Sequence, residues 1–353
     1  MTITSASNSK DELRIVFMGT PAFAVPSLRA LLNLTTIAGR PARVVAVVTQ
    51  PDRPAGRGGR VQASPVKVLA QEAHVPVLQS ERLRRPENVA ALRELRPDLV
   101  VVAAFAQILS RAVLDTPTHG CLNVHASLLP RWRGASPINA AILSGDAETG
   151  VTIMRMDPGL DTGPILTQRA APIRPDDTTA TLTERLSHVG AELLAATVGP
   201  WIAGEAVPRE QDESQVMVTR LLTREDGRID WTSAPAAVVE RMTRAYDPWP
   251  GAYTVHAGRT LKLWSATVLS DTPPEGAAPG QALAREQAMP LLQRLDLHWP
   301  QLVVATLDGL LLVRRIQPEG KRVMGGDDYM RGQSDIAGAQ LGEEGSPGSG
   351  VLK

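Results

Sequence analysis

Long apolar runs separated by helical patterns constrain the fold of this chain more than any other feature. The runs LRIVFMG at 13–19, ARVVAVVTQ at 42–50 and DLVVVAAFA at 98–106 are apolar at nearly every position. A strand of this kind is covered on both faces, as in a parallel sheet with helices on each side. The sequence therefore predicts an α/β fold built on a Rossmann-like, doubly wound, mostly parallel sheet.

The segments between these runs have the periodicity and the caps of helices. The stretch SPVKVLAQEAH at 64–74 starts with a serine cap and has Pro65 at the first helical position. Further helices are predicted over 26–32, 86–96 and about 179–203, and further strands over 75–79, 120–128, 151–156 and 163–173. Parallel sheets bind ligands beyond the carboxyl ends of their strands, so we expect a site after one of these strands.

The length of 353 residues allows two domains. We predict a flexible N-terminus at 1–11, a Rossmann-like domain at 12–204, a polar linker at 205–222, a second domain at 223–335 and a flexible tail at 336–353. The second domain contains short, glycine-separated apolar segments, which indicate antiparallel strands and a small β-barrel. The stretch at 282–300 reads as a surface insertion.

Composition places the chain in a broad class. The 37 basic and 37 acidic residues give a formal net charge of zero, so any nucleic-acid contact must come from a local patch. The single cysteine, Cys121, excludes an intrachain disulfide and a multi-cysteine zinc site, and a reducing compartment is expected. The N-terminus is polar, and no apolar run is long enough for a membrane span. We expect a cytoplasmic protein without a membrane segment.

The segment CLNVHASLLPRWRGASP at 121–137 carries the polar groups of a candidate site. Alternate side chains of a strand share a face, so Asn123, His125 and Ser127 project together if the segment stays extended. An amide and an imidazole on one face can stabilise an oxyanion, and the imidazole can also transfer a proton. A carboxylate beside the imidazole would fix its tautomer. Asp161, in the glycine-flanked loop DPGLDTGP, is the first candidate and Asp157 the second.

Other interpretations of the same residues remain open. From spacing alone, an Asn-x-His pair at the end of a strand is more often a satisfied polar cluster than a catalytic site. Ser127 lacks the G-x-S-x-G context of a nucleophile, and Cys121 has the surroundings of a buried, inert thiol. The histidines lack a compact set of further ligands, so no metal is expected. Arg131 and Arg133 either contact a ligand or face water.

NVHASLLPRWRGASPI, together with GVTIMRMDPGLDTGPIL downstream, resembles the signature of the folate-dependent formyltransferases. Three further segments, FMGTPAFAVPSLRAL, VTQPDRPAGRGGRVQASPVKVLA and IDWTSAPAAVVERMTRAYDPWPGAY, are similar to the branch that acts on methionyl initiator tRNA. The resemblance covers about residues 12–320. It implies transfer of a formyl group from 10-formyltetrahydrofolate, as co-substrate, to the amino group of methionyl initiator tRNA, without a metal.

The resemblance also assigns residues. The family's catalytic trio falls on Asn123, His125 and Asp161, and its folate-associated S-L-L-P element falls on Ser127, Leu128, Leu129 and Pro130. The glycine-rich loop at 49–67 corresponds to an inserted basic loop that reaches the acceptor end of the tRNA, with Arg57 as its key arginine and Arg53, Arg60 and Lys67 nearby. From composition alone this loop is an ordinary solvated one. The C-terminal domain is expected to be an OB-like, tRNA-binding barrel in a monomeric protein.

Related activities and other classes are the alternatives. A folate-dependent formyltransferase acting on a small amine, such as glycinamide ribonucleotide or a UDP-amino sugar, would share the trio, but the basic loop and the C-terminal domain argue against it. A nicotinamide oxidoreductase is disfavoured because FMGTPAF lacks G-x-G-x-x-G. A non-catalytic RNA-binding protein would have no need of the intact trio.

Overall fold

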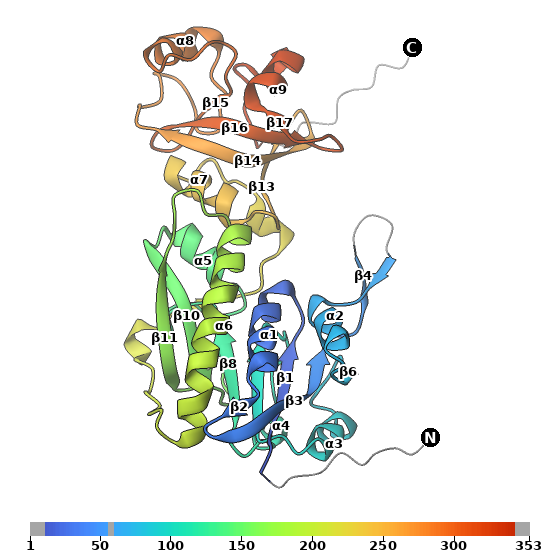
Figure 1. Cartoon of the computed structure of the whole chain (residues 1–353). Helices are drawn as coiled ribbons and strands as arrows, with labels where there is room; N and C mark the ends of the chain where they lie inside the picture. The colour runs from blue at the N-terminus through green and yellow to red at the C-terminus, as the bar shows by residue number, and fades with distance from the viewer. Residues whose placement is uncertain (1–10, 56–59, 343–353) are drawn as a thin grey trace. The chain divides into compact units, whose positions relative to one another are not determined.

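The computed structural model describes residues 11–55 and 60–342, and the chain divides into two compact units (Figure 1). Unit 1 comprises residues 1–138, 147–173 and 182–220, and unit 2 comprises residues 139–146, 174–181 and 221–353. The outer parts of the predicted flexible ends, 1–10 and 343–353, lie outside the described residues. Each unit has its own main sheet.

Unit 1 contains a large, parallel-rich sheet. Its strands run in the order β11-β10-β8-β7-β1-β3-β2, and β6 pairs with β3. The pairs β1–β3, β1–β7, β7–β8 and β3–β6 are parallel, whereas β10 is antiparallel to both β8 and β11. The bounds are β1 Leu13–Gly19, β2 Thr36–Ile37, β3 Arg40–Thr49, β6 Val77–Gln79, β7 Leu99–Ala103, β8 Cys121–His125, β10 Glu148–Arg155 and β11 Ile165–Pro172.

Helices cover both faces of this sheet, as the apolar runs predict. In Figure 1, α1 (Val25–Asn33) and α6 (Thr179–Ala203) cross one face. α6 packs closely because it has glycine at position 190, where a Cβ atom would lie 2.8 Å from Cγ1 of Val124. The opposite face packs against α3 (Pro86–Glu94) and α4 (Arg111–Leu114) in one apolar cluster that includes Val16, Met18, Val89, Leu92, Val100, Val102 and Val113.

The predicted helix at 64–74 is α2 (Pro65–Glu72), and its cap is confirmed. The Ser64 side chain accepts a hydrogen bond from the Lys67 backbone N–H at 3.2 Å, and Pro65 occupies the first turn. The serine thus satisfies one of the donors that every helix leaves unpaired at its start. Ser64 also shares a hydrogen bond of 2.9 Å with Thr49, which ties the helix to the end of β3.

Two small strand pairs complete unit 1. β4 (Arg53–Ala55) and β5 (Arg60–Gln62) form an antiparallel pair within the predicted basic loop. β9 (Arg133–Gly134) pairs in parallel with β12 (Val218–Thr219), and Arg209 and Ile165 exchange two backbone hydrogen bonds of 2.8 Å. Residues 209–219, here called the strap, are therefore bound to unit 1, although the sequence predicts a linker there.

Unit 2 contains an antiparallel sheet of order β13-β14-β16-β15, with β17 on β16. Its bounds are β13 Ala252–His256, β14 Arg259–Leu269, β15 Val303–Ala305, β16 Leu310–Pro318 and β17 Met324–Gly325; the helices are α5 Pro137–Ser144, α7 Ala236–Ala245, α8 Arg285–Arg294 and α9 Gly326–Gly332. The antiparallel pairing is confirmed, and the OB-like barrel stays a prediction. Short 3-10 turns occur at Ala22–Ala24 and Glu213–Gln215 in unit 1, and at Arg224–Gly227 and Ser334–Ile336 in unit 2.

Two segments of unit 2 are more firmly packed than the sequence suggests. α8 lies within the predicted surface insertion at 282–300, and its Leu291 and Leu292 are buried in one cluster with Leu310 and Leu312 of the sheet. The interpretation as a surface insertion is therefore wrong. Residues 339–341, in the predicted flexible tail, hydrogen-bond to residues 280–282 through their backbones. The apolar residues at helical spacing in 282–300 are the sequence feature that indicates the packed helix α8.

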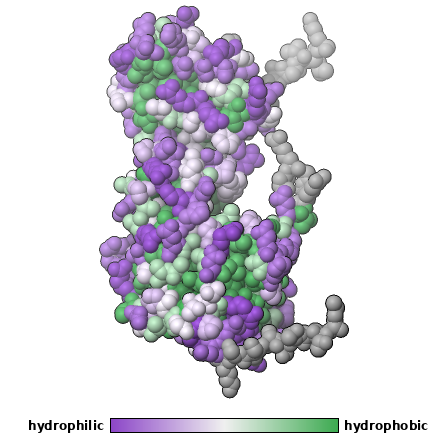
Figure 2. All heavy atoms as spheres, in the orientation of Figure 1, coloured by the Kyte–Doolittle hydropathy of each residue, from purple (hydrophilic) through white to green (hydrophobic). Residues whose placement is uncertain are grey.

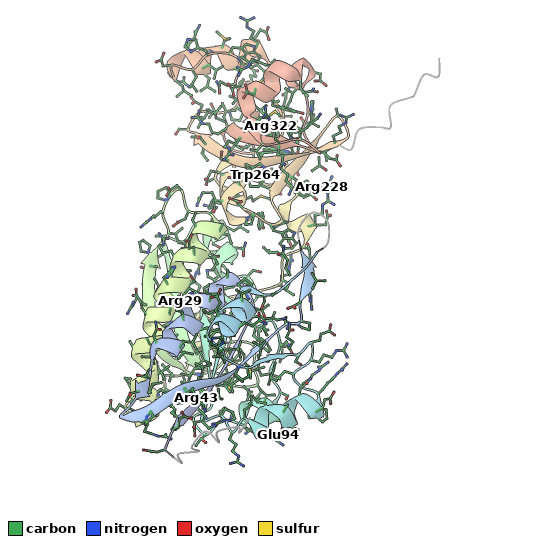
Figure 3. All side chains as sticks on the ribbon, turned by 45° about the vertical axis from the view of Figure 1, so that its right-hand side comes forward. Arg29, Arg43, Glu94, Arg228, Trp264 and Arg322 are labelled. Atoms are coloured by element: carbon green, nitrogen blue, oxygen red, sulfur yellow. The ribbon has the colours of Figure 1, made fainter. Side chains whose placement is uncertain are left out.

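Charged side chains lie on the outer surface of both units. Figure 3 shows Arg29 on α1, Arg43 on β3 and Glu94 on α3 projecting from unit 1, and all three are exposed. The face drawn in Figure 2 mixes hydrophilic and hydrophobic residues over both units. None of the helices in the described parts of the chain has the length and apolar character needed to cross a bilayer.

Candidate active site

The candidate site begins at the carboxyl end of β8. Asn123 and His125 alternate along this strand, so they share one face of the sheet. β8 pairs with β7 on one side and with β10 on the other, and His125 lies opposite Thr152 of β10. Only 9% of Asn123 and 6% of His125 is exposed, so both side chains need partners within the protein or a ligand.

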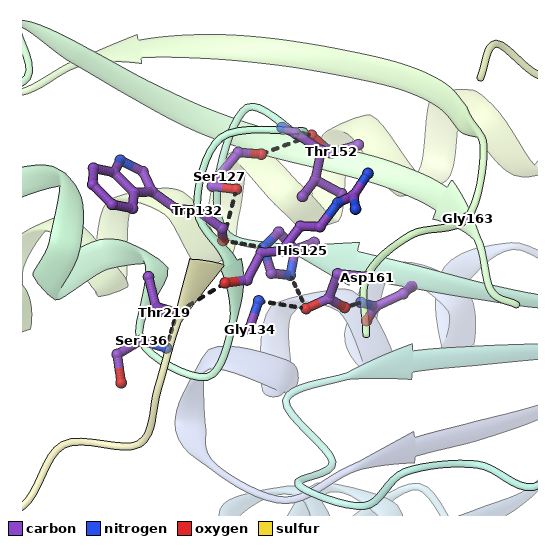
Figure 4. Close-up of polar contacts among 12 residues, drawn as sticks. His125, Ser127, Trp132, Gly134, Ser136, Thr152, Asp161, Gly163 and Thr219 are labelled. Atoms are coloured by element: carbon purple, nitrogen blue, oxygen red, sulfur yellow. Dashed lines mark hydrogen bonds and ion pairs between the residues drawn. The ribbon is translucent and has the colours of Figure 1, made fainter. Parts of the chain in front are cut away.

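Asp161 provides the carboxylate beside these two side chains. It lies in the loop between β10 and β11, and its Oδ2 atom is 3.7 Å from Nδ1 of His125 (Figure 4). Asn123 donates from Nδ2 to Oδ1 of Asp161 at 3.4 Å. The backbone N–H of Gly134 donates to Oδ2 at 2.8 Å, the shortest of these contacts. The structure thus brings together the three residues that the sequence singles out.

The second ring nitrogen of His125 fixes the orientation of the imidazole. Nε2 lies 3.0 Å from the backbone carbonyl oxygen of Trp132. A carbonyl only accepts hydrogen bonds, so Nε2 carries the hydrogen and Nδ1 faces the carboxylate of Asp161. A proton on Nδ1 would complete a charged pair with Asp161. The arrangement can therefore hold a proton at Nδ1, next to an amide donor and at the edge of the sheet.

Asp157, the second carboxylate candidate, has a different position. Its Oδ1 atom accepts from the Thr162 hydroxyl at 2.6 Å and from the Gly159 backbone N–H at 3.0 Å. These bonds close the turn on itself, and Asp161 is the residue that faces His125. Asp157 therefore braces the loop that carries Asp161.

Ser127 lies beyond the end of the strand that carries Asn123 and His125. β8 ends at His125, and the buried Ser127 hydroxyl donates to the backbone carbonyl oxygen of Arg131 at 2.7 Å. The condition for this expectation, an extended segment, ends at His125, yet the Ser127 hydroxyl still lies 3.4 Å from the carbonyl oxygen of Trp132 that His125 Nε2 contacts. The other residues of the predicted folate element lie in this turn: Leu129 is buried, Leu128 is partly exposed, and Pro130 follows a cis peptide bond. Their assignment to folate stays a prediction.

Cys121 is a structural residue at the start of β8. Its side chain is 1% exposed, and Sγ lies 3.9 Å from the carbonyl oxygen of Leu114. Burial, reinforced by the negative charge of Asp115 and partly offset by Arg155, raises the pKa of this thiol to about 12. A thiol with so high a pKa is a poor nucleophile near neutral pH, in agreement with the prediction of an inert cysteine.

The basic loop is only partly described. Arg53 is exposed on β4 and Arg60 lies on β5, whereas Arg57 falls outside the described residues. Lys67, the fourth basic residue, is paired: Nζ donates to Asp52 at 2.5 Å and to Gln79 at 3.0 Å. The bond from Lys67 is the main reason that the pKa of Asp52 is lowered from its ordinary value. A role in RNA binding for the three arginines stays a prediction.

Sequence reasoning missed the residues that hold Asp161 from outside its own loop. The Gly134 amide and the Gln211 side chain both contact Asp161. The sequence predicts that Arg133 either contacts a ligand or faces water. In the structure it is only 4% exposed and forms an ion pair of 2.6 Å with Glu213. No local pattern identifies these contacts, because Gln211 and Glu213 lie in a polar segment and have no periodic apolar neighbours.

Comparison with known proteins decides the family. Residues 13–198 match the Formyl transferase family, and residues 221–334 match the family described as Formyl transferase, C-terminal domain. The methionyl-tRNA formyltransferase of Geobacter sulfurreducens is 45% identical over 336 residues, which cover 95% of this chain and 98% of that protein. The enzyme of the same name from Roseiflexus castenholzii is 48% identical over 330 residues, covering 94% and 99%. The chain belongs to the methionyl-tRNA formyltransferase family.

Solved structures of more distant proteins have the same fold as this methionyl-tRNA formyltransferase family member. An N-formyltransferase from Helicobacter canadensis, in complex with folinic acid and dTDP-3-aminofucose, aligns with a TM-score of 0.59 at 17% identity, covering 87% of this chain and 99% of that one. HypX from Aquifex aeolicus, in complex with tetrahydrofolic acid, aligns with a TM-score of 0.55 at 17% identity, covering 92% of this chain and 47% of that one.

Proposed function

We propose that this protein transfers the formyl group of 10-formyltetrahydrofolate to the amino group of methionyl initiator tRNA. The observation that carries the proposal is the meeting of Asn123, His125 and Asp161 at one edge of the sheet, in a chain that matches named methionyl-tRNA formyltransferases over nearly its whole length. The same relatives disfavour glycinamide ribonucleotide or an amino sugar as the acceptor. A tetrahydrofolate co-substrate agrees with the ligands named for the structural neighbours.

The reaction exchanges one carbon–nitrogen bond for another. The methionyl amine attacks the formyl carbon, negative charge develops on the formyl oxygen, and the bond to the folate nitrogen then breaks. Asn123 would donate its amide hydrogen to that oxygen, since its present bond to Asp161 is long at 3.4 Å. Loss of one such donor typically lowers the rate a hundred- to a thousandfold, about 3 to 4 kcal/mol.

His125 and Asp161 would manage the proton. The attacking amine must lose one proton, and the leaving folate nitrogen must gain one, so the reaction needs a group that can do both. The imidazole can exchange a proton at Nδ1, which faces the carboxylate of Asp161. Asp161 keeps this geometry because the Gly134 amide holds its Oδ2 atom. No step requires a metal.

We assign catalysis and tRNA binding to different parts of the chain. Catalysis belongs to unit 1, which contains the trio and most of the Formyl transferase match. We assign tRNA binding to the C-terminal domain, residues 221–334, together with the basic loop that carries Arg53, Arg57 and Arg60. Ser127, Leu128, Leu129 and Pro130 are assigned to folate binding.

Substitution of the trio tests the proposal. Asn123→Ala, His125→Ala and Asp161→Asn should each lower formyl transfer to methionyl initiator tRNA at least a hundredfold, with circular dichroism and thermal unfolding close to wild type. Asp157→Asn is the matched control. An asparagine oxygen still accepts from Thr162 and Gly159, so its rate should stay within about threefold of wild type.

The acceptor is tested with the wild-type enzyme. Labelled 10-formyltetrahydrofolate is offered with methionyl initiator tRNA, unacylated tRNA, glycinamide ribonucleotide or a UDP-amino sugar. Product should form with the first alone. Transfer to a small amine at a comparable rate would refute the proposed substrate, and near wild-type rates in the trio variants would refute the residue roles.

A further inference from the structure

The backbone of Asp161 is strained. Its φ angle is +54°, in the left-handed region that residues other than glycine rarely adopt. Such a conformation costs on the order of 1 to 3 kcal/mol and persists only where surrounding groups enforce it. The glycines at 159 and 163 give the loop freedom, so they cannot supply this enforcement. Asp157 braces the loop from within through Thr162, and further contacts that fix Asp161 come from elsewhere in the chain.

Gln211 of the strap supplies one of these contacts directly. Its Nε2 atom donates to the backbone carbonyl oxygen of Asp161 at 2.7 Å and to that of Gly163 at 2.7 Å. Both hydrogens of the amide are therefore used on the two ends of one short turn. Gln211 is 8% exposed, so water competes little for these bonds.

Gln211 is itself held in one orientation. Its Oε1 atom accepts from Nε of Arg133 at 3.0 Å, and the guanidinium of Arg133 makes a bidentate pair with Glu213 at 2.6 and 3.3 Å. Because arginine only donates, the amide oxygen must face Arg133 and the amide nitrogen must face the Asp161 turn. The flip of this amide is thus decided by its partners.

The far end of the strap acts on the carboxylate of Asp161 through Gly134. The Thr219 hydroxyl donates to the carbonyl oxygen of Arg133 at 3.0 Å and accepts from the N–H of Ser136 at 3.0 Å. These bonds hold Arg133 and Ser136, which precede and follow Gly134 in the chain. The N–H of Gly134 in turn donates to Asp161 Oδ2 at 2.8 Å. The strap therefore fixes the carbonyl of Asp161 at one end and its carboxylate at the other.

We infer that Gln211 is a positioning residue for formyl transfer, which sets the carboxylate of Asp161 against His125 from within the strap. The inference rests on the proposed catalytic role of Asp161. Gln211 bonds to the backbone carbonyl oxygen of Asp161 and not to its carboxylate. Its direct link to the trio is therefore the backbone of Asp161, and we expect its effect on the reaction to pass through that residue.

Gln211→Glu is the informative variant. Glutamate keeps the oxygen that faces Arg133 and places a second oxygen, without hydrogens, against two carbonyl oxygens. The Asp161 turn should shift while the Arg133 network stays intact. Displacement of a catalytic group by about 1 Å can cost a hundredfold in rate, so kcat should fall about ten- to a hundredfold, with KM for methionyl-tRNA within threefold of wild type. Gln215→Glu is the matched control, because Gln215 is exposed on the same strap.

A double-mutant cycle with Asp161→Asn separates positioning from a merely structural role. If Gln211 acts through Asp161, adding Gln211→Glu to Asp161→Asn should lower the single-turnover rate by less than threefold. An equal loss in both backgrounds would overturn the inference. Gln211→Ala, which removes the side chain without introducing charge, serves as the test if the glutamate variant does not fold.

The outcomes separate the two proposals. Wild-type turnover in Asp161→Asn would overturn the catalytic assignment, and the positioning role would fall with it. Severe loss in Asp161→Asn, together with folded Gln211 variants whose kcat stays within threefold of wild type, would overturn the positioning role alone.

Discussion

Gly134→Ala would separate the strap from the Asp161 loop with a single methyl group. Gly134 has a φ angle of +101°, and a Cβ atom built there would lie 2.2 Å from the backbone carbonyl oxygen of Thr219. No rotation of a side chain can relieve a clash with backbone, so the pairing of β9 with β12 must open. The N–H of Gly134, which holds the carboxylate of Asp161, moves with it.

The expected losses of folding free energy and of turnover in Gly134→Ala follow from the backbone clash and from the displaced N–H. The left-handed backbone costs alanine about 1 to 3 kcal/mol, and opening the strand pair adds to this loss of folding free energy. For the reaction, a hydrogen bond to a charged group contributes about 1.5 to 3 kcal/mol, which corresponds to a fall in kcat of roughly ten- to 150-fold. Both values should be visible in ordinary urea unfolding and steady-state formylation assays.

Gly204→Ala is the control for backbone strain alone. Gly204 also has a positive φ angle, +75°, but nothing lies within 4 Å of a Cβ atom built there. This variant should lose about 1 to 2 kcal/mol of stability and keep wild-type turnover. If Gly134→Ala is no less stable than Gly204→Ala and turns over at the wild-type rate, the strap does not hold Asp161 and the reasoning fails.

Two further residues give predictions away from the site. Cys121 should resist thiol reagents at pH 8 in the folded protein, because a pKa of about 12 leaves about one thiolate in ten thousand; labelling as fast as in the urea-unfolded chain would contradict this. The thiol of the unfolded chain has the ordinary pKa of 9.0, so it ionises at a lower pH than the folded thiol. The contribution of this thiol to the free energy of unfolding is therefore full below pH 9 and falls as the pH rises toward 12. Cys121→Ala should flatten that fall when urea unfolding is measured over this pH range. Ser64→Ala should lower the free energy of unfolding by about 1 kcal/mol, since Lys67 N–H loses its cap; an unchanged urea midpoint would rule out the cap.

Much of the framework follows from periodicity. Runs that are apolar on both faces predict the parallel centre of the unit 1 sheet, where every residue of β7 and every residue of β1 except Arg14 is buried. The spacing of two places Asn123 and His125 on one face, because both lie inside β8. The same reasoning does not reach Ser127, which lies two residues beyond the end of the strand. Alternation holds only while the chain stays extended, and periodicity does not mark the residue at which it turns.

The contacts of the strap could not be predicted, because they join segments far apart in the chain. Gln211 donates to a carbonyl 50 residues away, and Arg133 bonds to a carboxylate 80 residues away. A buried polar group is stable only when partners satisfy it, and the identity of those partners is a property of the fold. Segment 205–222 therefore reads as a solvated linker from composition, although part of it is a hydrogen-bonded component of unit 1.

Gln211 and Gln215 show why composition alone cannot decide this question. The two identical side chains lie four residues apart in one polar strap, yet Gln211 is 8% exposed, whereas Gln215 is exposed and bonds locally to Asp212. Intrinsic polarity is the same in both cases. What differs is the presence of Arg133 on one side of Gln211 and of the Asp161 turn on the other. Burial of Gln211 therefore depends on partners from other segments of the fold, and its hydrogen bonds help to offset the cost of the left-handed backbone at Asp161.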